Sequence, residues 1–276
     1  MFGNSDGGRG GRDLDREFER GGMDRRGNEY DNRGYGAGQN NRAAYGEHAG
    51  EMESRSAVYL AKVMGWMCVG LLTTVVTAMA ALTMPAVWNL VFGGPGFFVV
   101  VIAQFVMVIA LSAGIQRMSP ATATVMFMAY SALTGLTMSV FVLIYDIPSL
   151  ILAFSVTTFV FLTMSIYGFV TKKDLTTLGR LAFFGLIGII AASLLNMFLG
   201  NPMMDLAITV VGVLVFIGLI AYDTQNIKGI YQQATASGYD EYSDEVRKLA
   251  IIGALKLYLD FINLFIMLLR LLGRRR

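Results

Sequence analysis

Seven long apolar runs constrain what this chain can fold into. Each is close to the roughly 20 residues that a helix needs to cross about 30 Å of hydrocarbon. Backbone groups in lipid must be paired within a helix or a closed barrel, and runs without strict alternation favour helices. The sequence therefore predicts an all-α membrane protein with seven transmembrane helices. The runs cover residues 58–83, 96–115, 121–145, 149–170, 181–200, 204–222 and 249–272.

The composition supports the same class of protein. Apolar residues make up 55% of the chain and charged residues 15%, whereas a soluble domain carries about a quarter charged residues. The net charge of +2 is small and the basic residues are scattered, which indicates no nucleic-acid partner. The only cysteine, Cys68, and the only histidine, His48, form no metal-binding pattern. We therefore expect a lipid bilayer around the chain and no tightly bound cofactor.

The N-terminal segment has a different character. It is rich in Gly, Arg, Asp, Glu and Asn and has almost no aliphatic side chains. Such a segment cannot bury enough apolar surface to offset the entropy lost on ordering. We expect residues 1–54 to be a disordered tail and residues 55–276 to be the seven-helix transmembrane domain.

The distribution of Lys and Arg predicts the orientation. Basic side chains in short loops resist translocation, so the side that carries them is expected to be cytoplasmic. The N-terminus would share that side, whereas the arginines at 274–276 would end outside, against the rule. Either the last run crosses, or it turns back, or an earlier run fails to cross; we favour seven crossings. The basic residues of this side are Arg42, Arg55, Lys62, Arg117, Lys172, Lys173, Arg180, Lys228, Arg247 and Lys248.

One acidic residue lies deep in the last apolar run. Asp260 is roughly 16 Å from the start of that run at 1.5 Å per residue, near the middle of the bilayer. Lys256 and Asn263 share its helical face. Ionisable groups at this depth usually face the bundle interior or a watery cavity. The alternative is a buried ion pair with Lys256 that only fixes packing.

A second acidic residue, Asp223, ends the sixth run on the same side from which the seventh returns. Neighbouring antiparallel helices commonly pack 8 to 10 Å apart. Asp223 would therefore approach Asp260 if the sixth helix extended by a turn or tilted inward. The alternative is a solvated residue at a helix end. Arg117, at the end of the second run, reads first as a determinant of topology.

Several small residues in the fifth and sixth runs suit close helix packing. Gly185, Gly188, Gly212 and Gly218 have no side chain to hold a neighbouring helix away. Packing alone explains their presence.

Motifs in the second half of the chain are specific when taken together. The sequence resembles the Bax inhibitor/YccA family of multi-pass membrane proteins, in particular its YccA-like bacterial branch, from about residue 55 to the end. This resemblance implies that the last helix is central and surrounded by the other six. The motifs are AYDTQ at 221–225, ALKLYLDFINLF at 254–265, LLRLLG at 268–273, MSP at 118–120 and AYSALTG at 129–135.

The resemblance also implies a function. Bacterial members are described as pH-sensitive calcium leak channels in which two aspartates of the last two helices share a proton. These positions match Asp223 and Asp260. An arginine near the cytoplasmic end of the second helix is associated with the closed state, and Arg117 is its positional match. We expect such a protein in the bacterial inner membrane with its N-terminus in the cytoplasm.

Physical chemistry gives this pair a mechanism. Two carboxylates held together in a low dielectric cannot both ionise freely, and their titration belongs to the pair. One shared proton would hold the two helices together, and its loss would favour opening. With Asn263, carbonyl groups and water, Asp223 and Asp260 would form only a weak calcium site. Weak binding suits calcium as a transported ion.

Two other functions start from the same residues. An intramembrane aspartyl protease would need Gly-x-Gly-Asp, whereas this chain has Leu257-Tyr258-Leu259-Asp260, so we expect no enzyme. The second is a regulatory membrane protein. The YccA-like resemblance implies association with an ATP-dependent membrane protease, for which the N-terminal tail would serve as a cytoplasmic handle.

Overall fold

The chain is a set of long helices that follow the apolar runs. The computed structural model describes the backbone of residues 27–276 and the side chains of residues 47, 50–89 and 92–276. Seven of the helices in this part are long and apolar enough to cross a membrane. The helices are α1 (Gly27–Thr83), α2 (Pro85–Phe92), α3 (Gly96–Gly114), the 3-10 helix η1 (Ile115–Arg117), α4 (Pro120–Ile144), α5 (Ile147–Val170), α6 (Thr176–Leu199), α7 (Pro202–Ala236) and α8 (Asp244–Leu272).

Residues 1–53 and 54–276 form two separate compact units. The expected disorder of residues 1–26 lies outside the described residues. Residues 27–53 are drawn as the first part of α1, and the bounds of the disordered tail, 1–54, stay a prediction. Adding residues to an existing helix costs much less than nucleating one, so a polar segment can continue a helix that the membrane stabilises.

Caps at the breaks explain where several helices begin. The side chains of Ser119, Asp146, Asn201 and Ser243 each accept a hydrogen bond from a backbone N–H in the first turn of α4, α5, α7 and α8, respectively. α6 ends at Leu199 and is capped by Gly200, whose φ of 61° suits glycine. Backbone groups at these helix ends are therefore paired.

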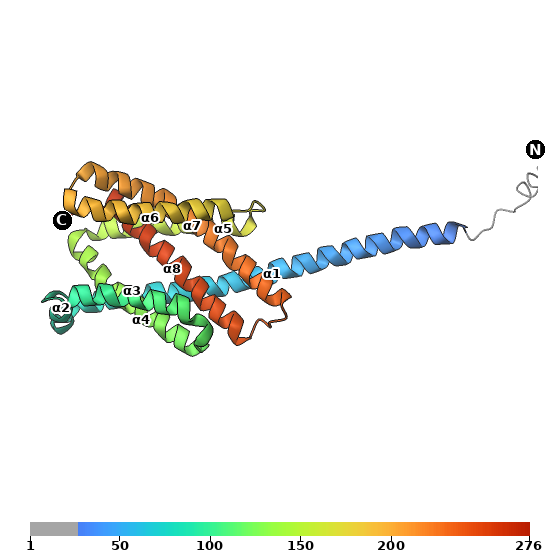
Figure 1. The fold of residues 1–276 in the computed structure, drawn as a ribbon, viewed down its shortest axis with the longest axis horizontal. Helices are drawn as coiled ribbons and strands as arrows, with labels where there is room; N and C mark the ends of the chain where they lie inside the picture. The colour runs from blue at the N-terminus through green and yellow to red at the C-terminus, as the bar shows by residue number, and fades with distance from the viewer. Residues whose placement is uncertain (1–26) are drawn as a thin grey trace, which may run out of the picture. The chain divides into compact units, whose positions relative to one another are not determined.

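The last helix is central, as the resemblance implied. In its apolar window 56% of the residues are buried, against 6% in α3 and 11% in α6. Within residues 54–276, Figure 1 shows α8 passing between α5, α6 and α7 on one side and α1, α3 and α4 on the other. Tyr258 of α8 lies at the centre: its hydroxyl is 2.6 Å from that of Thr74 in α1, and its ring meets Phe127 and Tyr130 of α4 edge-on.

α8 runs from one end of the bundle to the other. Its C-terminal extension pairs with the turn between α4 and α5: the N–H of Asp146 donates to the carbonyl of Arg274 at 3.3 Å, and the N–H of Arg276 donates to Ile144 at 2.9 Å. The chain therefore ends at the side opposite to the α5–α6 and α7–α8 connections (Figure 1). This geometry agrees with a last helix that crosses and not with one that turns back.

Candidate functional site

Asp260 is the buried acidic residue of α8. Its side chain is only 5% exposed, and its Oδ2 meets no hydrogen-bond donor among the described residues. Its carboxyl group lies within hydrogen-bonding range of the carboxyl group of Asp223 in α7. Two ionised carboxylates have no proton for such a bond, so a hydrogen bond between these two groups would need a proton on one of them.

Asp223 reaches this position because α7 continues well beyond its apolar run. The sequence placed Asp223 at a helix end, but α7 extends to Ala236 and Asp223 lies in its interior. Its side chain is 14% exposed. Of the two alternatives open for Asp223, the structure favours the approach to Asp260 over a solvated helix end.

Lys256 pairs with Asp223. The Nζ of Lys256 is 3.8 Å from Oδ1 of Asp223, and its side chain is 38% exposed. The sequence had left open that Lys256 neutralises Asp260 alone. Instead, the lysine lies at the more accessible of the two acids and leaves Oδ2 of Asp260 unpaired within the described part of the chain.

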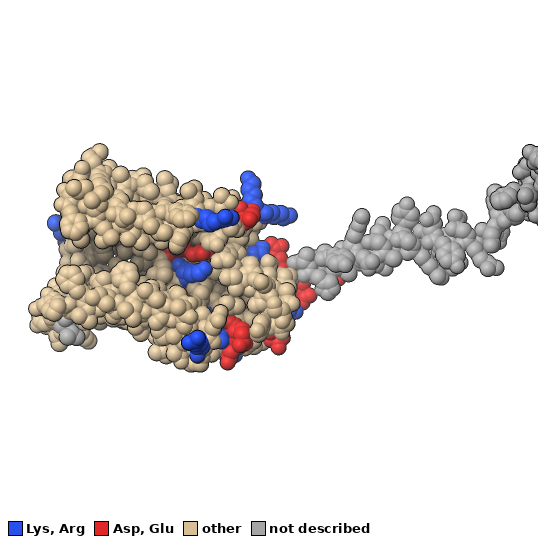
Figure 2. Space-filling model, in the orientation of Figure 1, with Lys and Arg blue, Asp and Glu red and all other residues tan. Residues whose placement is uncertain are grey.

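The two aspartates line a cavity of about 500 Å³ between α6, α7 and α8. Lys256 and Asn263 also line it, as predicted from their shared helical face. The amide of Asn263 donates to the carbonyl of Leu259 at 2.8 Å, so this donor is already paired within α8. Figure 2 shows acidic and basic atoms gathered in a hollow near the middle of this face of residues 54–276, apart from the charged groups toward one end of the molecule.

The guanidinium group of this cavity comes from α6. Arg180 lines it, together with Tyr222, which precedes Asp223. Arg117 instead lies exposed on η1, does not line the cavity, and forms no ion pair with a described residue. Sequence reasoning had treated Arg180 only as a marker of orientation. Its place directly before the predicted run at 181–200, on the side where Asp223 ends its own run, was the available signal.

The site contains few metal ligands. Among the described residues, no three His, Cys, Asp or Glu side chains come together as a group that could hold a metal ion. Asp223 and Asp260 therefore have only neutral oxygens and water to complete a calcium shell of six to eight ligands.

Comparison with known proteins identifies the family. Residues 56–276 match the family model described as "Inhibitor of apoptosis-promoting Bax1". The chain belongs to the Bax inhibitor family. This confirms the resemblance that its motifs carried, over the range that they covered.

Three bacterial relatives show how far the similarity extends. The inner membrane protein YbhL of Escherichia coli K12 is 47% identical over 219 residues, which are 79% of this chain and 92% of YbhL. A protein of Borreliella burgdorferi is 41% identical over 219 residues, again 79% and 92% of the two chains. A membrane protein of Streptococcus pyogenes serotype M1 is 42% identical over 173 residues, 63% of this chain and 72% of its own. The chain is thus a multi-pass membrane protein of a family with bacterial members.

Proposed function

We propose that this protein is a low-flux cation leak channel whose opening is controlled by the proton that Asp223 and Asp260 share. The observation that carries the proposal is the contact between the two carboxyl groups, of which the Asp260 group is almost fully buried. A structural ion pair would explain Lys256 and one aspartate, Asp223. It would not explain why a second carboxyl group, that of Asp260, lies beside the carboxyl group of Asp223.

The pair works as a switch because α7 and α8 each contribute one carboxyl group. With the proton present, a hydrogen bond joins the helices. Without it, two negative charges about 4 Å apart repel by roughly 4 kcal/mol at an effective dielectric constant of 20. A shift from 1% to 99% open needs about 5.5 kcal/mol. The repulsion, reduced by Lys256, is therefore large enough to change the open fraction substantially but not completely.

Calcium is the proposed cargo. The cavity offers two carboxylates, the oxygen of Asn263 and room for water, which suits a hard cation held weakly. An ion that binds weakly leaves quickly, as conduction requires. Arg180 and Lys256 at the same cavity keep its net charge near zero when the pair is ionised, which favours a low flux over a fast one.

The direct test is ion flux in proteoliposomes loaded with a calcium indicator, between pH 6 and 8. We expect the flux of the wild-type protein to rise as the pH rises, and Asp223→Asn and Asp260→Asn to remove most of that pH dependence. Asp205→Asn is the matched control, because Asp205 lies on α7 but pairs with Arg270 at 3.7 Å, away from the cavity. Equal flux in the wild type and both cavity variants at every pH would rule out the pair as a gate.

The setting of the channel is part of the proposal. YbhL is an inner membrane protein, and we place this chain in the bacterial inner membrane with its N-terminus in the cytoplasm. In that orientation Lys172 and Lys173 of the α5–α6 connection lie on the cytoplasmic side. Arg117 remains a candidate for an ion pair in a second, closed arrangement of η1, testable by the flux of Arg117→Gln.

Association with an ATP-dependent membrane protease is the second role that the resemblance implies. Truncation of residues 1–54 tests it without touching the cavity. We expect co-purification with the protease to fall while flux is retained. Loss of both would assign the tail to the channel instead.

A further inference from the structure

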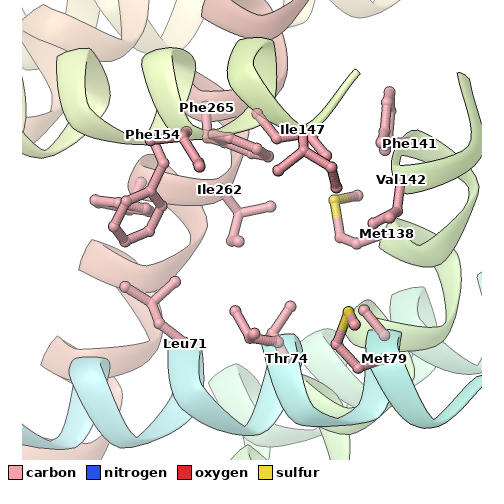
Figure 3. A pocket seen from close by; sticks show the side chains of 15 residues that line it. Leu71, Thr74, Met79, Met138, Phe141, Val142, Ile147, Phe154, Ile262 and Phe265 are labelled. Carbon is pink, nitrogen blue, oxygen red and sulfur yellow. The ribbon is translucent and has the colours of Figure 1, made fainter. Parts of the chain in front are cut away.

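A second cavity lies on the other side of α8. It has a volume of about 450 Å³, within the range of small-molecule sites. Figure 3 shows labelled side chains of α1, α4, α5 and α8 around it, including Met79, Met138, Ile147 and Phe265. It shares no lining residue with the cavity of the two aspartates.

The residues that line this second cavity, here called the crevice, are suited to an apolar ligand. Thr74 is the only one of the 15 lining residues that carries a hydroxyl, and its oxygen already bonds Gly70, Ser131 and Tyr258. Several wall residues are also open to the surroundings, including Val75 at 55% and Ile151 at 62% exposure. Because these positions lie within membrane-spanning segments, the crevice is accessible from the lipid.

Three arginines lie near one end of the crevice. The backbone N–H of Arg274 donates to Oγ of Ser149 at 2.9 Å, and Arg276 pairs with Ile144. The neighbouring residues Ile147 and Leu150 are part of the crevice wall. Arg274, Arg275 and Arg276 are all exposed. Asp146 is the acidic side chain of the turn to which they are bonded, so positive charge is in excess there.

We infer that this crevice binds one anionic phospholipid. An acyl chain lies against α1, α4, α5 and α8, and the phosphate of the headgroup is held by the arginines at 274–276. The apolar walls select a chain, and the guanidinium groups select an acidic headgroup over a zwitterionic one. The acyl chain and the headgroup are thus recognised by neighbouring parts of the fold, namely the crevice wall and the C-terminal arginines.

Native mass spectrometry of the full chain in detergent tests this inference, with phosphatidylglycerol and phosphatidylethanolamine of identical chains added in turn. We expect one phosphatidylglycerol per chain to be retained in preference to phosphatidylethanolamine. The variant with Arg274→Gln, Arg275→Gln and Arg276→Gln should lose this preference, by about fivefold for each arginine that contacts the phosphate. Lys172→Gln with Lys173→Gln is the matched control and should retain it, since both lysines lie in the α5–α6 connection.

A second set of variants tests the chain-binding part. Val75→Trp and Ile151→Trp place a large ring in the crevice and should reduce retention of both lipids. Val125→Trp is the control, because Val125 is 67% exposed on α4 and does not line the crevice. Unfolding temperatures of all three variants within a few degrees of that of the wild type exclude misfolding as the cause of reduced lipid retention. If one of the two crevice variants does not fold, the lipid retention of the other tests the inference.

Several outcomes would overturn the inference. These are equal retention of the two lipids by the wild type, unchanged retention in both crevice variants, and displacement of the lipid by inorganic phosphate alone. A chain that appears as a dimer without lipid, and becomes a monomer in Val75→Trp, would assign the crevice to a second copy.

Discussion

Gly168 of α5 lies at a close approach between α5 and α7. A Cβ added there would collide with the carbonyl group of Ala221, two residues before Asp223. Such a collision with backbone cannot be relieved by a rotamer change, so the two helices would have to separate. The position of Asp223 therefore depends on the absence of a side chain on a different helix.

This gives a prediction for two matched substitutions. Alanine is a better helix former than glycine by roughly 1 kcal/mol. Gly188→Ala, with nothing within 4 Å of the added atom, should gain up to that amount. Gly168→Ala should instead lose about 1 to 3 kcal/mol through overpacking. Reversible unfolding in mixed detergent micelles measures both, and a Gly168→Ala protein as stable as Gly188→Ala would show that α5 and α7 do not pack this closely.

The glycines also show what the sequence reveals at this scale. Gly185 and Gly212 lie against Val215 and Met267, as expected of small residues at helix contacts, whereas Gly188 faces open space. Gly168 had not been singled out. Residue size tells which positions permit a close approach, but not which face of a helix is turned toward a neighbour, because that depends on the rotation of each helix in the bundle.

At the scale of elements, the boundaries of the membrane-crossing helices follow the apolar runs to within about five residues, except at the start of α1 and the end of α7. The run ends at 222, yet the helix ends at Ala236. Polar residues beyond the bilayer continue a helix when other contacts support it. Gln225 provides two, since it accepts from the N–H of Leu175 at 2.9 Å and donates to the carbonyl of Lys173 at 2.8 Å. Hydropathy marks the edge of the lipid and not the end of a helix.

The start of α5 is held by a carboxylate whose pKa is lowered. Hydrogen bonds from the side chain and backbone of Ser149 are the largest cause, and Arg274 and Arg276 add to it. The ordinary value is 3.8, so the stabilisation is complete above that pH and is lost as the pH falls through the lowered pKa. Asp146 keeps its charge throughout pH 6 to 8. The proposed gating in that range therefore does not arise from this turn.

The same carboxylate gives a prediction for the C-terminal segment. Asp146→Asn removes the charge that attracts Arg274 and Arg276, so the segment should detach more easily. A spin label on Arg275→Cys, in a Cys68→Ala background, should be immobile in the wild type at pH 7 and mobile in Asp146→Asn. In the wild type it should become mobile only below about pH 4.

Asp174→Asn is the control for this experiment. The pKa of Asp174 is also lowered, mainly by the side chain and backbone of Thr176. It lies in the α5–α6 connection, at the other side of the membrane-crossing helices. The label should stay immobile in this variant. Equal mobility in the two variants would mean that the C-terminal segment does not depend on Asp146.

At the scale of the whole molecule, the apolar runs and charges alone leave open whether the last helix crosses the membrane. Arginines at 274–276 on the outer side contradict the charge rule when taken alone. In the structure, hydrogen bonds join this segment to the α4–α5 turn, so the last helix reaches that side of the bundle. Hydropathy carries no information about such contacts. The contact between Asp223 and Asp260 was likewise open, because it required both the extension of α7 and the close packing of α5.

Single cysteines in a Cys68→Ala background test the resulting topology. Lys173→Cys and Ser237→Cys lie in exposed connections at one side, and Gly94→Cys and Arg275→Cys lie at the other. We expect an impermeant maleimide to label 94 and 275 in intact spheroplasts, and 173 and 237 only in inverted vesicles. The α2–α3 and α6–α7 connections carry no Lys or Arg, whereas the predicted cytoplasmic side carries ten, among them Lys172 and Lys173. These ten should outweigh the three terminal arginines. Labelling of 173 and 275 from one side would show that α8 does not cross. A complete reversal would leave the fold intact but turn the Asp223 end of the pair away from the cytoplasm, against the proposed control by cytoplasmic pH.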